Sequence, residues 1–448
     1  MKKLAISGGE AVLTSKDEER IKAMTKWPII TEEDESACLE VIRNNSFSGS
    51  AITEKFEEEF KNWIGTDYAV AFCNGTMSLA AAMFSVGLGK GDEIICPTIT
   101  YWASVVQATT FGATAVFCNV DDKLCMDPDD LERVISPETK AIMVVHYASN
   151  PADMDRIMAI AKKHNLIVIE DVSHAQGGHY KGKKLGTFGD VAAMSLMSGK
   201  SFAAGELGIL VTNNRRCYER ALAYGHYDRN NEKYIKEAEE VFPYFRISLG
   251  GVKGRANQLC SALARVQLKY YDERCAEVRK AMNYMFDLIG DVPGFKPLRA
   301  NEAEGSDNAG YYCEFARYVP EELHGLSAKA FADALNAELG NFFRLRTGSN
   351  YCLHEHNFFK TFDFNNSGEP SRIQNQTRDV RVLDEKLESA LEKQKNVILC
   401  PPIKKYDKEM IEKIAQAVKN VIENHQQLIA TDEETTDEAG RWYGFDNH

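Results

Sequence analysis

The sequence contains no long hydrophobic run. None of its apolar stretches approaches the roughly 20 residues that a helix needs to cross a membrane. The first segment, MKKLAISGGEAVL, has two lysines but lacks the apolar region of a secretory signal peptide. We therefore expect a cytoplasmic protein that does not contact a membrane.

The spacings typical of metal sites and disulfide frameworks are also missing. The 11 cysteines are spread through apolar runs, and no two of them form a CxxC pair. His354 and His356 flank Glu355 at a spacing that differs from the helical HExxH motif, with no third ligand nearby. His174 and His179 lack cysteine or carboxylate companions. We expect reduced core cysteines and no metal.

The chain has fewer positive than negative side chains. The chain has 53 lysines and arginines against 66 acidic residues, which gives a net charge of −13 and a pI near 5.4. This balance opposes binding to nucleic acid, because affinity for a phosphate backbone depends on clustered lysine and arginine. It leaves room for one small phosphate in a local pocket.

What the sequence does contain is a regular alternation of short apolar runs and longer helical patterns. This alternation is typical of βα units on a largely parallel sheet, and it predicts an α/β fold. The chain has 448 residues, of which 44% are hydrophobic, enough for two or three domains with a substantial core. The predicted strands are YAVAFC (68–73), DEIICP (92–97), TAVFCNV (114–120), KAIMVVHY (140–147), LIVIEDV (166–172), DVAAMSLM (190–197) and ELGILVTNN (206–214).

Helical patterns separate these strands and continue beyond them. Helices are predicted over 75–87, 102–112, 127–135 and 153–165, with Asp127 and Asp153 as caps. A long helix over 257–290 leads into a smaller α+β region. The predicted domains are an N-terminal arm (1–45), a large domain with a seven-stranded sheet (46–250), a small C-terminal domain that includes the long helix (251–430) and an acidic, mobile tail (431–448).

The first candidate site is the turn that joins the first strand to the next helix. Asn74, Gly75 and Thr76 open that helix, so its first amide groups and the Thr76 hydroxyl can hold a phosphate at the positive end of the helix dipole. The alternative is a helix cap made by Asn74, with Gly75 allowing only the turn. The turn alone does not decide between them.

A second candidate follows the fifth strand. Asp171 lies at its carboxyl end, where ligands collect in open α/β sheets. If the ligand is a pyridine ring, this carboxylate keeps the ring nitrogen protonated. His174 can donate to a phenolic oxygen of the same ligand. A helix cap or a structural ion pair is the alternative role for Asp171.

Lys200 is the third candidate, because it lies among small and apolar residues between two predicted strands. Desolvation lowers the pKa of a buried lysine and gives the neutral amine that forms a Schiff base. A structural, ion-paired lysine is the alternative. The nearby GKS resembles part of a P-loop, but Met194 occupies the place of that motif's first glycine, so nucleotide binding is rejected.

Together, these segments resemble the DegT/DnrJ/StrS sugar aminotransferase family of fold-type I pyridoxal-phosphate enzymes. The resemblance is strongest over residues 151–214, from PADMDRIMAIAKKHNLIVIEDVSHAQ to GELGILVTNN. It also includes FSGSAITEKFEEEF, NGTMSL, GDEIICPTITYWASV and KGRANQLCSALARVQL. It covers about the first two-thirds of the chain well and the smaller domain loosely.

The resemblance implies a cofactor, pyridoxal 5'-phosphate, and a role for each candidate residue. Lys200 becomes the catalytic Schiff-base lysine and Asp171 the partner of the pyridine nitrogen. The other implied cofactor-binding residues are His174 beside the ring oxygen, Gly75, Thr76 and Ser195 around the phosphate, and Tyr101 stacked on the ring, with Trp102 as the alternative. Arg255 matches a residue that reaches the phosphate of the neighbouring subunit, which implies a homodimer with shared active sites.

The implied reaction is transfer of an amino group from glutamate or glutamine to a keto-sugar or keto-cyclitol. Related sugar dehydratases have histidine in place of the lysine, so Lys200 favours transamination over dehydration. The segments GHYDR and KGR resemble the branch that acts on inosose-type cyclitols. Leu207 and the divergent segment around His354 motivate one further alternative, a non-catalytic regulator or assembly protein that binds the cofactor.

Overall fold

The computed structural model describes residues 2–363, 368 and 378–432. Its centre is a seven-stranded sheet with the order β1-β9-β8-β5-β4-β2-β3, in which β9 runs antiparallel to both neighbours and the other pairs are parallel. The predicted α/β fold and mostly parallel sheet are therefore confirmed. The strands are β1 (Tyr68–Phe72), β2 (Glu93–Pro97), β3 (Thr114–Cys118), β4 (Thr139–Val145), β5 (Ile167–Asp171), β8 (Val191–Ser195) and β9 (Gly208–Thr212).

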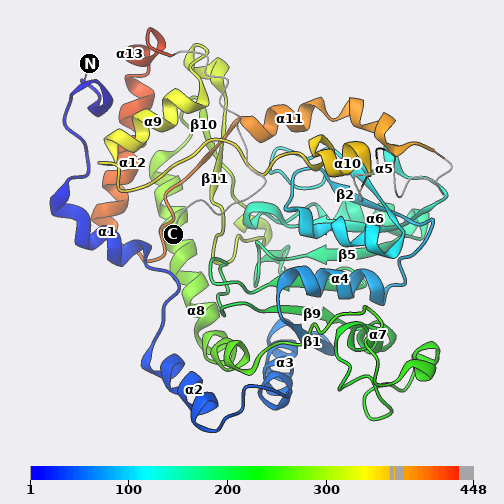
Figure 1. Cartoon of the computed structure of the whole chain (residues 1–448). Helices are drawn as coiled ribbons and strands as arrows, with labels where there is room; N and C mark the ends of the chain where they lie inside the picture. The colour runs from blue at the N-terminus through cyan, green and yellow to red at the C-terminus, as the bar shows by residue number, and fades with distance from the viewer. Residues whose placement is uncertain (1, 364–367, 369–377, 433–448) are drawn as a thin grey trace.

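Helices cover both faces of this sheet (Figure 1). In β1, Val70 and Phe72 face the cluster that contains α4 and α7, while Ala69 and Ala71 face the cluster that contains α3 and α8. Because both faces are buried, the strands can be continuous apolar runs. The helices around the sheet are α2 (Glu32–Arg43), α3 (Ala51–Ile64), α4 (Gly75–Ser85), α5 (Pro128–Val134), α6 (Met154–His164), α7 (Arg215–Gly225) and α8 (Gln258–Ile289).

The helix starts follow the local sequence closely. The side chain of Asp127 accepts from Asp129 N at α5, and that of Asp153 accepts from Arg156 N at α6, as expected for caps. One predicted helix is wrong: residues 102–112 form two 3₁₀ segments, Trp102–Ser104 and Val106–Phe111. The β-branched residues of this run disfavour a regular α-helix.

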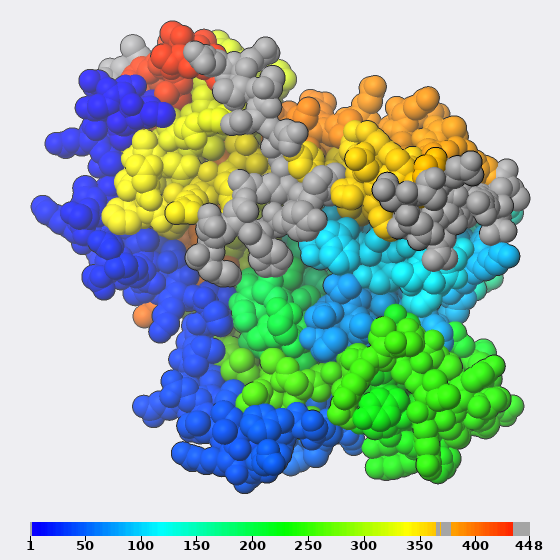
Figure 2. All heavy atoms as spheres, viewed as in Figure 1, coloured from blue at the N-terminus to red at the C-terminus, as the bar shows by residue number. Residues whose placement is uncertain are grey.

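A second, three-stranded antiparallel sheet with the order β10-β11-β12 lies beyond the first. Residues near both ends of the chain share its core, because Leu4, Leu13 and Ile21 pack with α9 and α12. Figure 2 shows this N-terminal segment, in blue, against the yellow and red segments. The elements here are α1 (Glu18–Thr25), β10 (Phe295–Pro297), β11 (Phe315–Tyr318), α9 (Ala328–Glu338), α10 (Asn357–Thr361), α11 (Glu388–Lys395), β12 (Val397–Leu399), α12 (Lys408–Glu423) and α13 (Gln426–Ile429).

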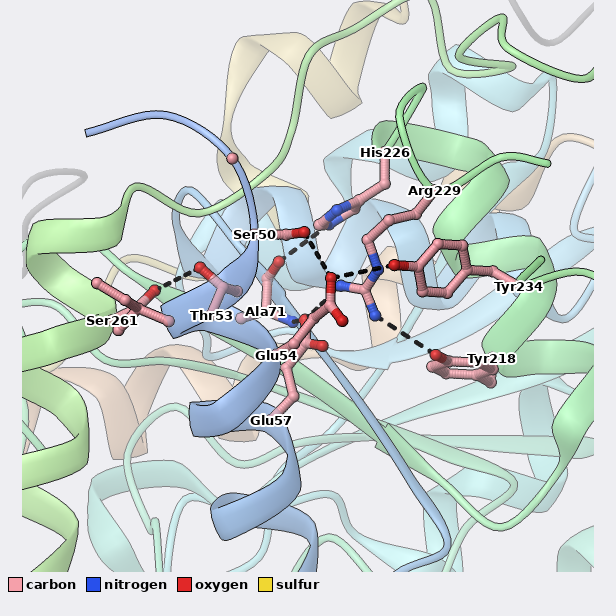
Figure 3. A network of polar contacts seen from close by, with 12 residues as sticks. Ser50, Thr53, Glu54, Glu57, Ala71, Tyr218, His226, Arg229, Tyr234 and Ser261 are labelled. Carbon is pink, nitrogen blue, oxygen red and sulfur yellow. Dashed lines mark hydrogen bonds and ion pairs between the residues drawn. The ribbon is translucent and has the colours of Figure 1, made fainter. Parts of the chain in front are cut away.

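A buried polar network ties α3 to β1 and to the segment after α7 (Figure 3). Arg229 donates to Glu57 Oε1 at 2.9 Å and lies 3.4 Å from the hydroxyl of Tyr218. The same Glu57 oxygen accepts from Ala71 N at 2.7 Å, and His226 Nε2 lies 3.0 Å from Ala71 O. Buried ionic groups need such partners, so this network fixes how the first strand meets its helices.

Two predictions are not tested by this architecture. The domain boundaries at 45, 250 and 430 stay predictions, and the acidic tail lies outside the described residues from position 433 onward. Among the helices that the structure describes, none is both long enough and apolar enough to span a bilayer.

Candidate active site

A cavity of about 1700 Å³ lies at the carboxyl ends of the central strands. Lys200, Asp171 and His174 line it, as do Gly75, Thr76, Ser195 and Tyr101. In an open parallel sheet, this edge is where ligands bind. Seven of the eight residues that the sequence nominated therefore share one cavity.

Lys200 is buried in the wall of this cavity. Burial lowers the pKa of its amine from 10.5 to about 8. Its Nζ lies 4.0 Å from the centre of the Tyr312 ring. Among the described residues, no hydrogen bond or ion pair engages Nζ, so the amine is available for reaction. The structural, ion-paired alternative is not supported.

The backbone around Lys200 is held firmly in place. Lys200 N donates to Met197 O at 2.8 Å, and the indole of Trp27 donates to Lys200 O at 2.9 Å. The next residue, Ser201, donates to the side chain of Gln176 at 2.7 Å. The main chain is therefore fixed from several directions, and the long side chain reaches into the cavity from a rigid base.

Asp171 is oriented by neutral hydrogen-bond donors. Ser104 Oγ donates to Asp171 Oδ2 at 2.7 Å, and Ser173 N donates to Oδ1 at 3.0 Å. Thr100 Oγ1 lies 2.7 Å from Ser104 Oγ, and since the Ser104 proton goes to the carboxylate, Thr100 is the donor to Ser104. No positive side chain is paired with Asp171 among the described residues. Both carboxylate oxygens are therefore held by neutral donors, and no basic side chain of the described residues competes with a cationic ligand group.

His174 is neutral in this environment. Burial and, to a smaller extent, the charge of Lys200 hold the pKa of His174 well below its usual value. Ala148 N donates to His174 Nδ1 at 3.3 Å, so the remaining ring proton lies on Nε2. His174 can therefore donate one hydrogen bond through Nε2. Its ring centre lies 4.6 Å from that of Tyr312.

The turn at the start of α4 has the helix cap that was one of its two predicted roles, and its free amide groups leave the other role, anion binding, open. Asn74 Oδ1 accepts from Met77 N at 2.9 Å, which confirms the cap. The amide groups of Gly75 and Thr76 have no acceptor within the helix, because the first helical positions lack one. A Cβ on Gly75 would lie 2.5 Å from Ser195 Cβ. Glycine therefore lets the end of β8 approach the first turn of α4, where an anion gains from the helix dipole.

The remaining nominated residue lies elsewhere. Arg255 does not line the cavity and forms an ion pair with Asp228 at 2.8 Å. Of the two neighbouring aromatic candidates, Tyr101 lines the cavity and Trp102 does not. Leu207 is fully buried in the core formed with α3 and α8, away from the cavity lining.

The region of the smaller sheet contributes residues to the cavity that the sequence did not predict. Tyr312, Cys313, Arg346 and Asn350 all line the cavity, opposite the strand ends. Asn350 Oδ1 accepts from the hydroxyl of Tyr147 at 2.6 Å, which joins the two walls. These positions lie where the resemblance was loose and show no spacing that marks a site. Ser104 had a weak signal, since it lies in a hydroxyl-rich run close to Tyr101.

The chain is similar in sequence to known proteins. The sequence model of the DegT/DnrJ/EryC1/StrS aminotransferase family matches residues 28–400. The chain is 31% identical over 349 residues to the L-glutamine:2-deoxy-scyllo-inosose aminotransferase of Streptomyces kanamyceticus, which covers 75% of this chain and 79% of that protein. It is 36% identical over 228 residues to the GDP-perosamine synthase of Escherichia coli O157:H7, and this match covers 51% of this chain and 60% of that protein.

A similar fold is found among solved structures. The aminotransferase from Psychrobacter cryohalolentis superposes with a TM-score of 0.72 at 26% identity, covering 90% of this chain and 99% of that one. The family match and the fold therefore agree over nearly the whole described chain.

Proposed function

This chain belongs to the DegT/DnrJ/EryC1/StrS aminotransferase family, and from that premise we propose that it transfers an amino group from glutamine or glutamate to a ketone on a cyclitol or a sugar. It is a pyridoxal-phosphate-dependent transaminase. The single observation that carries the assignment of the site is one shared cavity, in which a buried and unpaired Lys200 amine, the Asp171 carboxylate and the first turn of α4 come together.

The residues of this cavity fit the cofactor. Pyridoxal phosphate has an aldehyde, a pyridine nitrogen and a phosphate. The cavity presents an amine with a pKa lowered to about 8, a carboxylate without a basic partner and an anion cradle at Gly75 and Thr76. We assign Lys200 to the aldehyde, Asp171 to the ring nitrogen and Gly75, Thr76 and Ser195 to the phosphate. Tyr101 and His174 take the ring face and the ring oxygen.

The chemistry divides between the cofactor and the chain. When bound, the cofactor acts as an electron sink for the carbon that bears the amino group. Lys200 Nζ would take a proton from the α-carbon of the donor and so act as the general base of the site. Asp171 keeps the ring nitrogen protonated, while Ser104 and Ser173 N keep this carboxylate in place. His174, being neutral, stabilises the ring oxygen through its Nε2 proton.

The relatives support a cyclitol ketone as acceptor. The relative from S. kanamyceticus, which matches over three-quarters of the chain, is named for L-glutamine and 2-deoxy-scyllo-inosose. The perosamine synthase has higher identity over a shorter stretch, so a keto-sugar is the second candidate. We propose glutamine as the first donor to test and a keto-inositol as the first acceptor.

The proposed function is tested by the cofactor spectrum. The purified protein should be yellow, and borohydride should fix the cofactor to the peptide that contains Lys200. Glutamine or glutamate should then convert the bound aldehyde form to the amine form, which a keto-cyclitol should reverse. Lys200→Ala should abolish both conversions. Labelling of another lysine, or full turnover by Lys200→Ala, would contradict the assignment.

We further propose a homodimer in which Arg255 serves the neighbouring site. In this chain Arg255 lies outside the cavity and next to an exposed Tyr227. Ile247, in the same stretch, is 64% exposed. Exposed apolar side chains beside an arginine that lies outside its own cavity favour a protein contact. A cytoplasmic location stays our prediction, and the eleven free thiols agree with a reducing compartment.

A further inference from the structure

Arg346 lies in an extended segment that is fixed against the smaller sheet. Its carbonyl oxygen accepts from Leu399 N of β12 at 2.8 Å. One residue earlier, the side chain of Asn336 both donates to Leu345 O and accepts from Leu345 N, each at 2.9 Å. These bonds hold the main chain at Arg346 and at the residue before it. The side chain therefore starts from a rigid position, as a binding residue requires.

The guanidinium of Arg346 has no acidic partner. Arg346 is half-buried and lines the same cavity as Lys200. Within residues 2–363, 368 and 378–432, no hydrogen bond or ion pair engages its side chain. The other cations of the wall differ: Lys329 pairs with Asp333 at 2.8 Å, and Lys395 is exposed. Arg346 is thus a fixed positive group in the cavity whose charge is not neutralised by the described part of the chain.

We propose that Arg346 binds the α-carboxylate of the amino donor. This inference rests on the proposed function and assigns one of its substrates to a subsite. A glutamine or glutamate donor carries a carboxylate on the carbon that loses its proton, and arginine binds carboxylates with two parallel hydrogen bonds. A cyclitol ketone carries no carboxylate. Arg346 therefore recognises the donor and not the acceptor.

The size of the cavity makes such an anchor necessary. Its volume of about 1700 Å³ exceeds the roughly 300–1000 Å³ of ordinary small-molecule sites. A donor of amino-acid size does not fill this space, so shape alone cannot orient it. A fixed contact at the carboxylate leaves the α-carbon only one bond away, and so restricts where its proton can lie in the cavity that Lys200 also lines.

Separate half-reactions test this assignment. The cofactor spectrum of Arg346→Gln is followed first with glutamine and then, after loading with pyridoxamine phosphate, with the keto-cyclitol acceptor. We expect the concentration of glutamine for half-maximal conversion to rise at least tenfold, with an unchanged rate on the acceptor. Arg346→Lys should recover part of the loss. Equal weakening of both half-reactions would overturn the proposal, because Arg346 would then serve both substrates or the fold.

The role of Arg346 can also be tested by the binding of a substrate analogue, without turnover. Glutarate has carboxylates but no amine, so its binding to the cofactor-loaded protein can be followed by calorimetry. We expect at least tenfold weaker binding by Arg346→Gln and unchanged binding by Arg344→Gln, a nearby exposed arginine outside the cavity lining. No glutarate binding to the wild type, or equal binding to all three proteins, overturns the role of Arg346. If the wild type binds glutarate but no donor changes its spectrum, the proposed function fails while the anion subsite stands.

Discussion

At the scale of one residue, the burial of Lys200, which we propose as the cofactor's attachment point, opposes stability. Its amine is buried and lies 4.0 Å from the centre of the Tyr312 ring, without an acidic partner among the described residues. A structural lysine would not be selected for this position, because burial disfavours its charged form. The same burial lowers the pKa of the amine to about 8 and so raises its neutral fraction near neutral pH. Stability and chemistry therefore make opposite demands at this position.

This conflict leads to a prediction for the cofactor-free protein. In the unfolded chain the Lys200 amine has its ordinary pKa of 10.5, and folding lowers that pKa to about 8. Below pH 8 both states are protonated, and the folded state bears the whole desolvation cost, about 3 kcal/mol at 1.36 kcal/mol per unit. The cost decreases as pH rises from 8 to 10.5, because the folded state loses its proton first. Lys200→Met should therefore be more stable than the wild type by up to about 3 kcal/mol at pH 7 and less so at pH 10.

Urea unfolding of the cofactor-free proteins at both pH values measures this difference. Lys405→Met, at an exposed lysine, is the matched control and should change stability little at either pH. A Lys200→Met variant less stable than the wild type at pH 7, or an advantage that does not change with pH, would show that Lys200 stabilises the fold.

The sequence identified these residues because each has a local signature. Asp171 follows an apolar strand, Lys200 interrupts an apolar stretch and Gly75 opens a helix, so order along the chain was enough to nominate them. Tyr312 and Arg346 have no such signature. Their place in the cavity depends on how the smaller sheet packs on the larger one, and that packing is not encoded in any local pattern.

At the scale of elements, the close approach of α4 to β8 shapes the turn that we propose as the phosphate cradle. The two elements meet where Gly75 leaves no room for a side chain, because an added Cβ would lie 2.5 Å from Ser195 Cβ and 2.7 Å from its Cα. Both atoms belong to a strand end and cannot move freely. The first turn of α4 would have to retreat, and the cradle would widen.

We therefore predict that Gly75→Ala weakens both the fold and cofactor binding. Overpacking of this kind costs about 1–3 kcal/mol, and the displaced amides should raise the dissociation constant of pyridoxal phosphate at least tenfold. Fluorescence titration and urea unfolding give the two values. Gly89→Ala is the control, since its nearest neighbouring atom would lie 3.9 Å away. Equal behaviour of the two variants would mean that the close approach is not what shapes the cradle.

The network of Figure 3 locks α3 to β1 and the segment after α7. The side chains of Glu57 and Arg229 are 6% and 3% exposed. Arg229→Met leaves a buried carboxylate unpaired, so we expect a loss of about 3–5 kcal/mol in the free energy of unfolding. Adding Glu57→Gln removes that charge but keeps an oxygen for Ala71 N. The double variant should therefore be more stable than Arg229→Met alone in urea, and a further loss would show that Glu57 stabilises the fold independently of Arg229.

The elements themselves were largely predictable. All seven predicted strands of the large sheet are confirmed, because buried β-branched runs bounded by turns specify strands well. The predicted α-helix over 102–112 was wrong, because the hydrophobic pattern of a short segment does not distinguish a 3₁₀-helix from an α-helix. The sharing of one core by Leu4 and α12 was not predictable either, because the two segments lie at opposite ends of the chain.

At the scale of the whole molecule, the position of Arg255 bears on the homodimer that we propose. Arg255 is paired with Asp228 at 2.8 Å and does not line its own cavity. A role at the neighbouring site, as we propose, would account for an arginine that lies outside its own cavity.

Mixed dimers give a decisive test of shared sites. A Lys200→Ala homodimer lacks the amine at both sites, and an Arg255→Ala homodimer lacks the arginine at both. If Arg255 serves the partner's site, a dimer with one chain of each kind contains one complete site, formed by Lys200 of one chain and Arg255 of the other. We expect about half the wild-type activity per dimer from tagged and purified mixed dimers, against little from either homodimer. If Arg255 acts within its own chain, the only chain with Lys200 lacks its arginine, and mixing restores nothing. Since the two arrangements predict opposite results from the same sample, activity of the mixed dimer distinguishes a shared site from two independent ones.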